Sequence, residues 1–236
     1  MTDLEPPQNP KSTIQNEDPF SSMDRMYRYQ RYFYNVTRKY YLLGRDKLLA
    51  EMDVQFDENV LEIGCGTGRN LAILAKRHPT ARFFGLDASA AMLETASETI
   101  TRSNLTNITL KTALADTFSY DKTFELDQLF DAVFFSYSIS MIPPWRESIE
   151  NALKNLKPSG TLYVVDFYDQ RDLPKFFQKL LRGWLRQFHV QFWDDLLPFL
   201  QNLEDKGLGK LQISPIYRRY AFCLSFRKAE LPETQL

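Results

Sequence analysis

The feature that most constrains the fold is a short apolar run ending in alternating glycines, Val60-Leu61-Glu62-Ile63-Gly64-Cys65-Gly66-Thr67-Gly68. Glycines at this spacing allow a tight turn and a close approach of the backbone to a ligand. The following stretch, Arg69–Arg77, has helical spacing, so unpaired N–H groups at its start would face the same turn. The pattern therefore predicts a buried strand, a ligand-binding loop and a helix.

The rest of the chain repeats this alternation of strands and helices. Short apolar runs predict strands, and amphipathic stretches between them predict helices, an order typical of a parallel sheet. Two closing runs predict an antiparallel strand pair at the sheet edge. The expected strands are Asn59–Ile63, Arg82–Leu86, Ile108–Ala113, Asp131–Ser136, Thr161–Phe167, Lys210–Ile216 and Arg219–Arg227; the expected helices include Leu42–Met52, Ala90–Thr101, Glu147–Leu156 and Trp193–Lys206, with an irregular insertion at Tyr120–Gln128.

Composition divides the chain into three parts. Residues 1–20 hold four prolines and few large apolar groups, which predicts a disordered tail. Residues 21–56 are rich in aromatic and basic side chains, and we expect helices that form a lid. Residues 57–236 would form the main domain.

Charge and cysteine content exclude several classes of protein. The net charge of −1 argues against a nucleic-acid partner, and two cysteines without a Cys/His cluster argue against a metal site. No apolar run reaches the length of a membrane span, and the start lacks an export signal. We therefore expect a cytoplasmic protein that can bind peripherally to a membrane surface.

The glycine pattern, with Glu62 just before it, resembles motif I of the class I S-adenosylmethionine (AdoMet) methyltransferases. The resemblance implies a Rossmann-like α/β fold: a mostly parallel seven-stranded sheet, helices on both faces and the C-terminal antiparallel pair. It also implies AdoMet as the cofactor. Asp87, at the end of the second strand, is placed to accept hydrogen bonds from ribose hydroxyls. The implied cofactor-binding residues are Glu62, Gly64, Cys65, Gly66, Thr67, Gly68, Asn70, Asp87, Ala88, Met92, Asp116 and Ser136.

The methyl acceptor is indicated by the N-terminal segment. Aromatic faces attract methylated ammonium and sulfonium groups, and arginines bind carboxylates or phosphates. Five segments, YRYQRYFYNVTRKYYLLGRD, VLEIGCGTGRNL, FFGLDASAAMLETA, FFSYSISMIPPWRE and VVDFYDQRDLP, resemble the AdoMet:diacylglycerylhomoserine N-methyltransferases of betaine-lipid synthesis, the BtaB type. This resemblance runs from about residue 23 to about residue 226.

The resemblance implies three N-methylations of a homoserine amine linked to diacylglycerol. Such a substrate implies a membrane surface and, as a functional partner, an aminocarboxypropyltransferase that makes the lipid. Asp131, Ser136 and Tyr137 flank the fourth strand, where this fold places groups facing the substrate. The expected catalytic residues are Tyr34, Tyr40, Tyr41 and Tyr137; the expected substrate-binding residues are Tyr27, Arg28, Arg31, Arg45 and Trp145.

Two questions stay open at this point. The amphipathic segment Leu173–Trp193 fits a helix that packs on the sheet, and it also fits one that lies in a membrane interface. The acceptor also has rivals: phosphatidylethanolamine, a quinone or another small molecule. A regulator that binds AdoMet without catalysis would carry the same motifs.

Overall fold

The computed structural model describes residues 42–187 and 190–230. In this part of the chain, seven strands form one sheet in the order β3-β2-β1-β4-β5-β7-β6. The first five strands are parallel, and β7 pairs antiparallel with both β5 and β6. The strands are β1 (Asn59–Ile63), β2 (Arg82–Asp87), β3 (Ile108–Thr112), β4 (Phe130–Ser136), β5 (Leu156–Phe167), β6 (Gly209–Ile216) and β7 (Ala221–Lys228).

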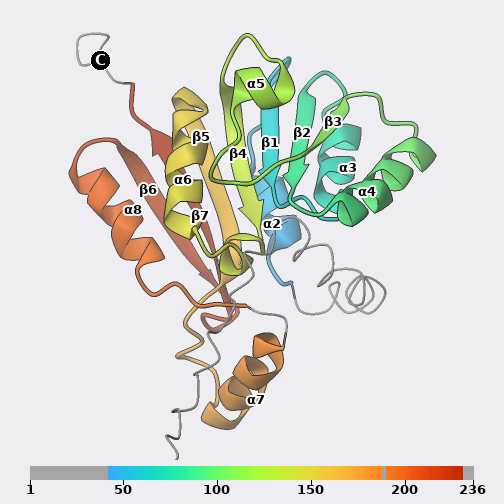
Figure 1. The fold of residues 1–236 in the computed structure, drawn as a ribbon. Helices are drawn as coiled ribbons and strands as arrows, with labels where there is room; N and C mark the ends of the chain where they lie inside the picture. Colours follow the sequence, from blue (N-terminus) through green and yellow to red (C-terminus); the bar gives the residue numbers. More distant parts are fainter. Residues whose placement is uncertain (1–41, 188–189, 231–236) are drawn as a thin grey trace, which may run out of the picture.

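Helices cover both faces of this sheet (Figure 1). One hydrophobic core gathers side chains of α2, α3 and α7, and a second core gathers those of α5, α6 and α8. The architecture confirms the predicted Rossmann-like sheet with its C-terminal antiparallel pair. The helices are α2 (Arg45–Glu51), α3 (Arg69–Arg77), α4 (Ala90–Arg102), α5 (Tyr120–Phe124), the 3-10 helix η1 (Ile139–Met141), α6 (Trp145–Lys154), α7 (Lys175–Arg186) and α8 (Leu196–Asp205).

The central strands form because their apolar runs are buried on both faces. All five residues of β1 are buried, as expected of a strand in the middle of a parallel sheet. At the start of α4, the hydroxyl of Ser89 accepts a hydrogen bond from the N–H of Met92 and caps the helix. These local signals explain why β1 has its predicted bounds and why α4 begins at its predicted first residue, Ala90.

The insertion after β3 corrects the prediction of an irregular segment, because it contains α5. The hydroxyl of Ser119 caps this helix by accepting from the N–H of Lys122. Phe124 then packs edge-on against Phe84 and Phe130, with ring centroids 5.4 and 5.6 Å away. Burial of this phenylalanine, which is a tertiary contact, stabilises a helix too short to be predicted from periodicity.

The segment 42–56, assigned to the lid by its composition, contributes to the core. Leu48 and Leu49 of α2 are buried against the sheet. The remainder of the predicted lid and the predicted tail lie outside the described residues. No helix within the described ranges is both long and apolar enough to cross a bilayer.

Candidate functional site

The parallel strands place their carboxyl ends along one edge, and the strand order changes direction between β1 and β4. Ligands of open α/β sheets bind outside such a point. The glycine loop lies here: Gly64, Gly66 and Gly68 all have positive φ, at 71°, 54° and 72°. The N–H groups of Gly64 and Cys65 both donate to the carbonyl of Leu86, at 2.9 and 3.0 Å. The loop is thus fixed to the end of β2 by its backbone.

Two of these glycines also leave no room for a side chain. A Cβ on Gly64 would lie 2.5 Å from the Cβ of Ser138, and one on Gly68 would lie 3.0 Å from that of Ala96. The hydroxyl of Ser138 donates to the carbonyl of Ile63 at 2.7 Å. The loop after β4 therefore packs directly on the glycine loop, which joins the two sides of the candidate site.

Asp87 is buried at the end of β2 and faces the glycine loop. Its Oδ2 accepts from the N–H of Gly66 at 2.8 Å, and its Oδ1 accepts from the N–H of Ser89 at 2.9 Å. These two amides orient the carboxylate between the ends of β1 and β2. A carboxylate has lone pairs for further hydrogen bonds, so this geometry fits the ribose of a nucleoside cofactor.

Glu62 and Asn70 support the loop from beneath. The side-chain amide of Asn70 donates to Oε1 of Glu62 at 2.7 Å, and both residues are buried. This bond joins β1 to the first turn of α3. At the start of the same helix, Arg69 pairs with Asp46 of α2 at 2.9 Å.

The other predicted cofactor residues lie along the same edge. Ala88 follows Asp87, and Met92 is buried in the first turn of α4. Asp116 is half-buried in the turn after β3, while Cys65 and Thr67 lie within the glycine loop. Ser136, the last residue of β4, is buried, and its hydroxyl has no hydrogen-bond partner among the described residues. That hydroxyl is available to a bound group, so the donor set fits AdoMet.

Tyr137, which is predicted to be catalytic, directly follows β4 and is held by a contact within the protein. Its phenol is buried and donates to the carbonyl of Leu43 at 2.5 Å, which holds the start of α2. Burial, followed by the charge of Asp166, raises the pKa of this phenol well above its ordinary value. In this structure Tyr137 keeps its proton and fastens the chain before α2 to the sheet, and its catalytic role stays a prediction.

The structure also shows the surroundings of Trp145 and Arg45, which stay predictions as substrate-binding residues, and it corrects the prediction for Asp131. Trp145 is buried at the start of α6, where its ring packs against those of Trp193 and Phe199. Arg45 is also buried, and its Nε donates to the carbonyl of Leu42. Asp131 lies at the amino end of β4, the opposite edge of the sheet, where it pairs with Lys157 at 2.7 Å. Tyr27, Arg28, Arg31, Tyr34, Tyr40 and Tyr41 lie outside the described residues.

A second buried aspartate at this edge was missed by the sequence analysis. Asp166, near the end of β5, accepts from the N–H of Ser140 at 3.0 Å and from that of Phe167 at 2.7 Å. Burial raises its pKa to about 6. It holds the loop after β4 as Asp87 holds the loop after β1. The available signal was an acid inside the apolar run Val164-Val165-Asp166-Phe167.

Beyond β5 the edge carries a second group of polar side chains. Asp169 binds the guanidinium of Arg219 through both carboxylate oxygens, and that guanidinium stacks on Tyr168. Gln170 is fully buried in the left-handed region, at φ 59°, and within residues 42–187 and 190–230 its side-chain amide has no partner. Beside them opens a pocket of about 330 Å³, lined by aromatic rings that include Phe192.

Comparisons with known proteins agree with this geometry. The model of the methyltransferase domain family, Methyltransf_31, matches residues 56–204. Trans-aconitate 2-methyltransferase of Escherichia coli O1:K1 is 26% identical over 164 residues, covering 68% of this chain and 53% of that protein. The enzyme of that name from Shigella dysenteriae serotype 1 is 25% identical over 161 residues, covering 68% and 53%. The chain thus spans about half the length of these curated relatives.

Solved structures show the same fold. The AdoMet-dependent methyltransferase SibL in its apo form has a TM-score of 0.64 at 22% identity, covering 84% of this chain and 58% of that one. The DhpI–SAH complex has a TM-score of 0.63 at 18% identity, covering 90% and 98%. The methyltransferase family and the geometry of the residues at the strand ends support AdoMet as the cofactor. On the family match and the glycine loop together, the chain belongs to the methyltransferase domain family.

Proposed function

We propose that this protein transfers methyl groups from AdoMet to the homoserine amine of diacylglycerylhomoserine, up to the trimethylated betaine lipid. We infer methyl transfer from the family to which the chain belongs. We infer the acceptor from the resemblance of segments 134–147 and 164–174 to the betaine-lipid enzymes. A reaction that attaches an aminocarboxypropyl group to diacylglycerol must then supply the substrate.

The observation that supports the proposal is how these two segments meet. The N–H of Tyr137 donates to the carbonyl of Val165 at 2.8 Å, and the N–H of Ser140 donates to Asp166. Ser138 lies against the glycine loop. These two of the five segments that carry the resemblance are therefore fastened to each other and to the cofactor loop, at the edge where an acceptor would lie.

The chemistry asks little of the protein beyond positioning. Bound AdoMet supplies a methyl group on a sulfonium, which is already a good leaving group. The chain must hold the neutral amine in line with that bond. After each of the first two transfers, the methylated ammonium must release its proton to water before it can react again. The unpartnered hydroxyl of Ser136 at the end of β4 would accept a hydrogen bond from the amine, and Asp87 with the glycine loop would hold the nucleoside. The acceptor must arrive as the neutral amine, since an ammonium has no lone pair.

A second candidate comes from the sequence relatives, which are named as methyltransferases of trans-aconitate. An acceptor with several carboxylates needs cations at the site. Two arginines at this edge already bind acids: Arg69 pairs with Asp46, and Arg219 pairs with Asp169. In the described part of the chain these two arginines are therefore not free for an acceptor with several carboxylates, which favours the homoserine lipid with its single carboxylate.

The test is methyl transfer to defined acceptors by the purified full chain. Mixed micelles of diacylglycerylhomoserine, micelles of phosphatidylethanolamine, a demethylated quinone and trans-aconitate are each incubated with labelled AdoMet. Mass spectrometry then counts the methyl groups on each product. We expect mono-, di- and trimethylated homoserine lipid. Label on another acceptor and none on this lipid would refute the proposed acceptor. Binding of AdoMet with no label on any acceptor would favour a regulator.

A further inference from the structure

We propose that the exposed half of α7 docks on the surface of an anionic lipid bilayer. The docking face consists of the apolar side chains Phe176, Phe177 and Leu180 and the flanking cations Lys175 and Lys179. The inference deepens the proposed function and rests on it for its purpose, but lipid-surface binding can be measured without any methyl transfer.

The apolar side of α7 is divided between the core and the surface. Leu181 and Leu185 are buried in the domain, whereas Phe176, Phe177 and Leu180 are 81%, 47% and 61% exposed. At roughly 100° per residue, the three exposed side chains fall within an arc of about 100°. A contiguous apolar strip on a surface helix marks an interaction site. The helix thus packs on the domain with one side and offers the adjoining side to a partner.

The charge of α7 selects the kind of partner. The helix contains the cations Lys175, Lys179, Arg182 and Arg186 and no acidic residue. Arg182 is bound within the protein, to the carbonyl of Asp169 at 2.8 Å and over the ring of Phe192. Lys175 and Lys179 are exposed beside the apolar strip. Aromatic and aliphatic groups flanked by cations are suited to the interface of an anionic membrane.

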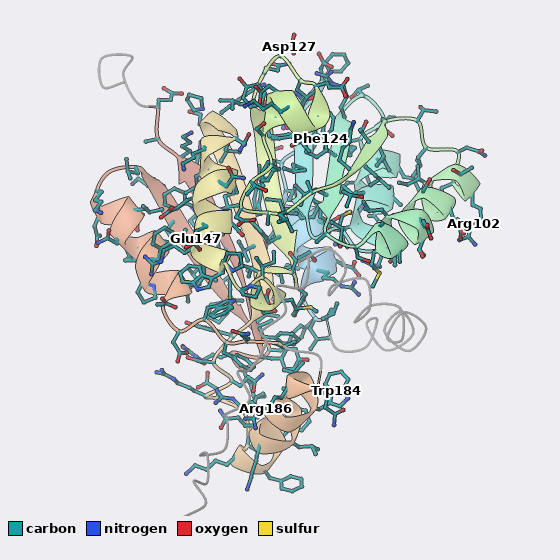
Figure 2. All side chains as sticks on the ribbon, viewed as in Figure 1. Arg102, Phe124, Asp127, Glu147, Trp184 and Arg186 are labelled. Carbon is teal, nitrogen blue, oxygen red and sulfur yellow. The ribbon has the colours of Figure 1, made fainter. Side chains whose placement is uncertain are left out.

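The position of α7 would turn the reaction edge toward that membrane. Figure 1 shows α7 standing away from the sheet, beyond the carboxyl ends of its parallel strands. Figure 2 shows Trp184 and Arg186 at the end of α7 nearer the sheet, so the residues at its start extend outward. The side chain of Gln178 donates to the carbonyl of Gln170 at 3.0 Å and ties the helix to the end of β5. Docking through α7 would therefore bring an acceptor at the bilayer surface close to the cofactor edge.

The experiment is flotation of the purified full chain with vesicles. One set contains phosphatidylcholine with phosphatidylglycerol, and the other contains phosphatidylcholine alone. The test variant is F176S/F177S/L180S. The matched control is Phe56→Ser, because Phe56 is 79% exposed in the loop between α2 and β1. A second test variant, K175Q/K179Q, isolates the charge; its control is K76Q/K206Q, which removes two lysines exposed on α3 and after α8.

We expect the full chain to float with anionic vesicles and much less with neutral ones. The triple variant should lose at least about tenfold in the bound fraction, and the double lysine variant should lose binding to anionic vesicles only. Both controls should bind like the unchanged chain. Unchanged binding of the triple variant would overturn the inference.

Other occupants of the docking face give different results. If the triple variant changes the oligomeric state in analytical ultracentrifugation, the face contacts a second copy and the inference is overturned. If it lowers the unfolding temperature, the face is covered by this chain and the inference is overturned as well. The proposed acceptor and the proposed docking face are tested separately, because methyl transfer in detergent micelles does not require binding to a vesicle. Vesicle binding with no transfer to the homoserine lipid would refute the acceptor and leave the docking face standing.

Discussion

The edge formed by the carboxyl ends of the parallel strands has two halves, which are built by different means. In the cofactor half, beside β1 and β2, the loop is held by backbone hydrogen bonds and by Asp87, and its left-handed positions are glycines. The other half, called the acceptor half because we propose that the acceptor lies there, extends from the end of β5 onward. Its left-handed positions are Gln170, Tyr217, Arg218 and Arg219, and an ion pair holds the segment.

Each left-handed side chain costs about 1 kcal/mol or more, so contacts from elsewhere must maintain this half. A loop whose backbone binds a common cofactor can therefore be encoded within a few consecutive residues. The acceptor half instead needs side chains brought together from distant segments.

The largest loss of stability is expected when a side chain is added to the closely packed glycine loop of the cofactor half. Gly64→Ala would place a Cβ 2.5 Å from Ser138 at φ 71°. Overpacking and left-handed strain together should cost about 4 kcal/mol of folding free energy, and AdoMet binding should be lost. Gly207→Ala is the matched control, because its φ is 74° but no atom lies within 4 Å. Urea unfolding and calorimetric titration with AdoMet measure both; equal costs for the two variants would show that the contact with Ser138 is unimportant.

The next largest effect is on the pH dependence of stability, to which Asp166 and Asp169 of the acceptor half contribute with opposite signs. Burial raises the pKa of Asp166 from 3.8 to about 6, so the folded state favours its proton. Its contribution to stability is full below about pH 4 and falls by about 3 kcal/mol as the pH rises through 6. Urea unfolding from pH 4 to pH 7 should therefore show this decrease in the unchanged chain and a flatter profile in Asp166→Asn.

Asp169 provides the opposite sign for comparison. Its hydrogen bonds to Arg219 hold the pKa of Asp169 below its ordinary value. That stabilisation is present above the ordinary pKa and is lost as the pH falls, so Asp169→Asn should alter the acidic side of the same profile. A decrease between pH 4 and pH 7 that persists in Asp166→Asn would contradict the assignment to Asp166.

In the cofactor half, Asp87→Asn should weaken AdoMet binding by roughly thirtyfold, about 2 kcal/mol, because the amide replaces a charged acceptor. Asp131→Asn is the control, since Asp131 lies at the opposite edge of the sheet and pairs with Lys157. Calorimetric titration with AdoMet should give unchanged affinity for that control. Equal affinity in Asp87→Asn and the unchanged chain would remove Asp87 from the cofactor site.

The smallest effect is a gain in stability, and it concerns α7 in the acceptor half. Gly183 lies within α7, and a Cβ there would meet no atom within 4 Å. Gly183→Ala should stabilise the helix by about 0.5–1 kcal/mol, because alanine loses less backbone entropy on folding. Thermal unfolding measures the gain; a loss of stability would show that α7 packs against something at this position.

Much of the fold and the cofactor side could be read from the sequence, because those signals are local. An apolar run, alternating glycines and helical spacing follow one another within β1, the loop and α3. Asp87 follows the next strand, so its place beside the loop follows from the parallel order of β1 and β2. The short helix α5 was not predictable in this way, since it depends on rings contributed by β2 and β4.

The acceptor side was decided by tertiary structure. Tyr137, Trp145 and Arg45 were expected at the substrate because of their residue types, but packing buried all three. Asp166 became a structural acid because distant amides reach it. The periodicity of α7 determined an amphipathic helix and left both of its environments open. Tertiary structure decided that Leu181 and Leu185 are buried while Phe176 and Leu180 stay exposed, because only the folded domain determines how much of an apolar face it can cover. Contact of the exposed side with a membrane is our proposal.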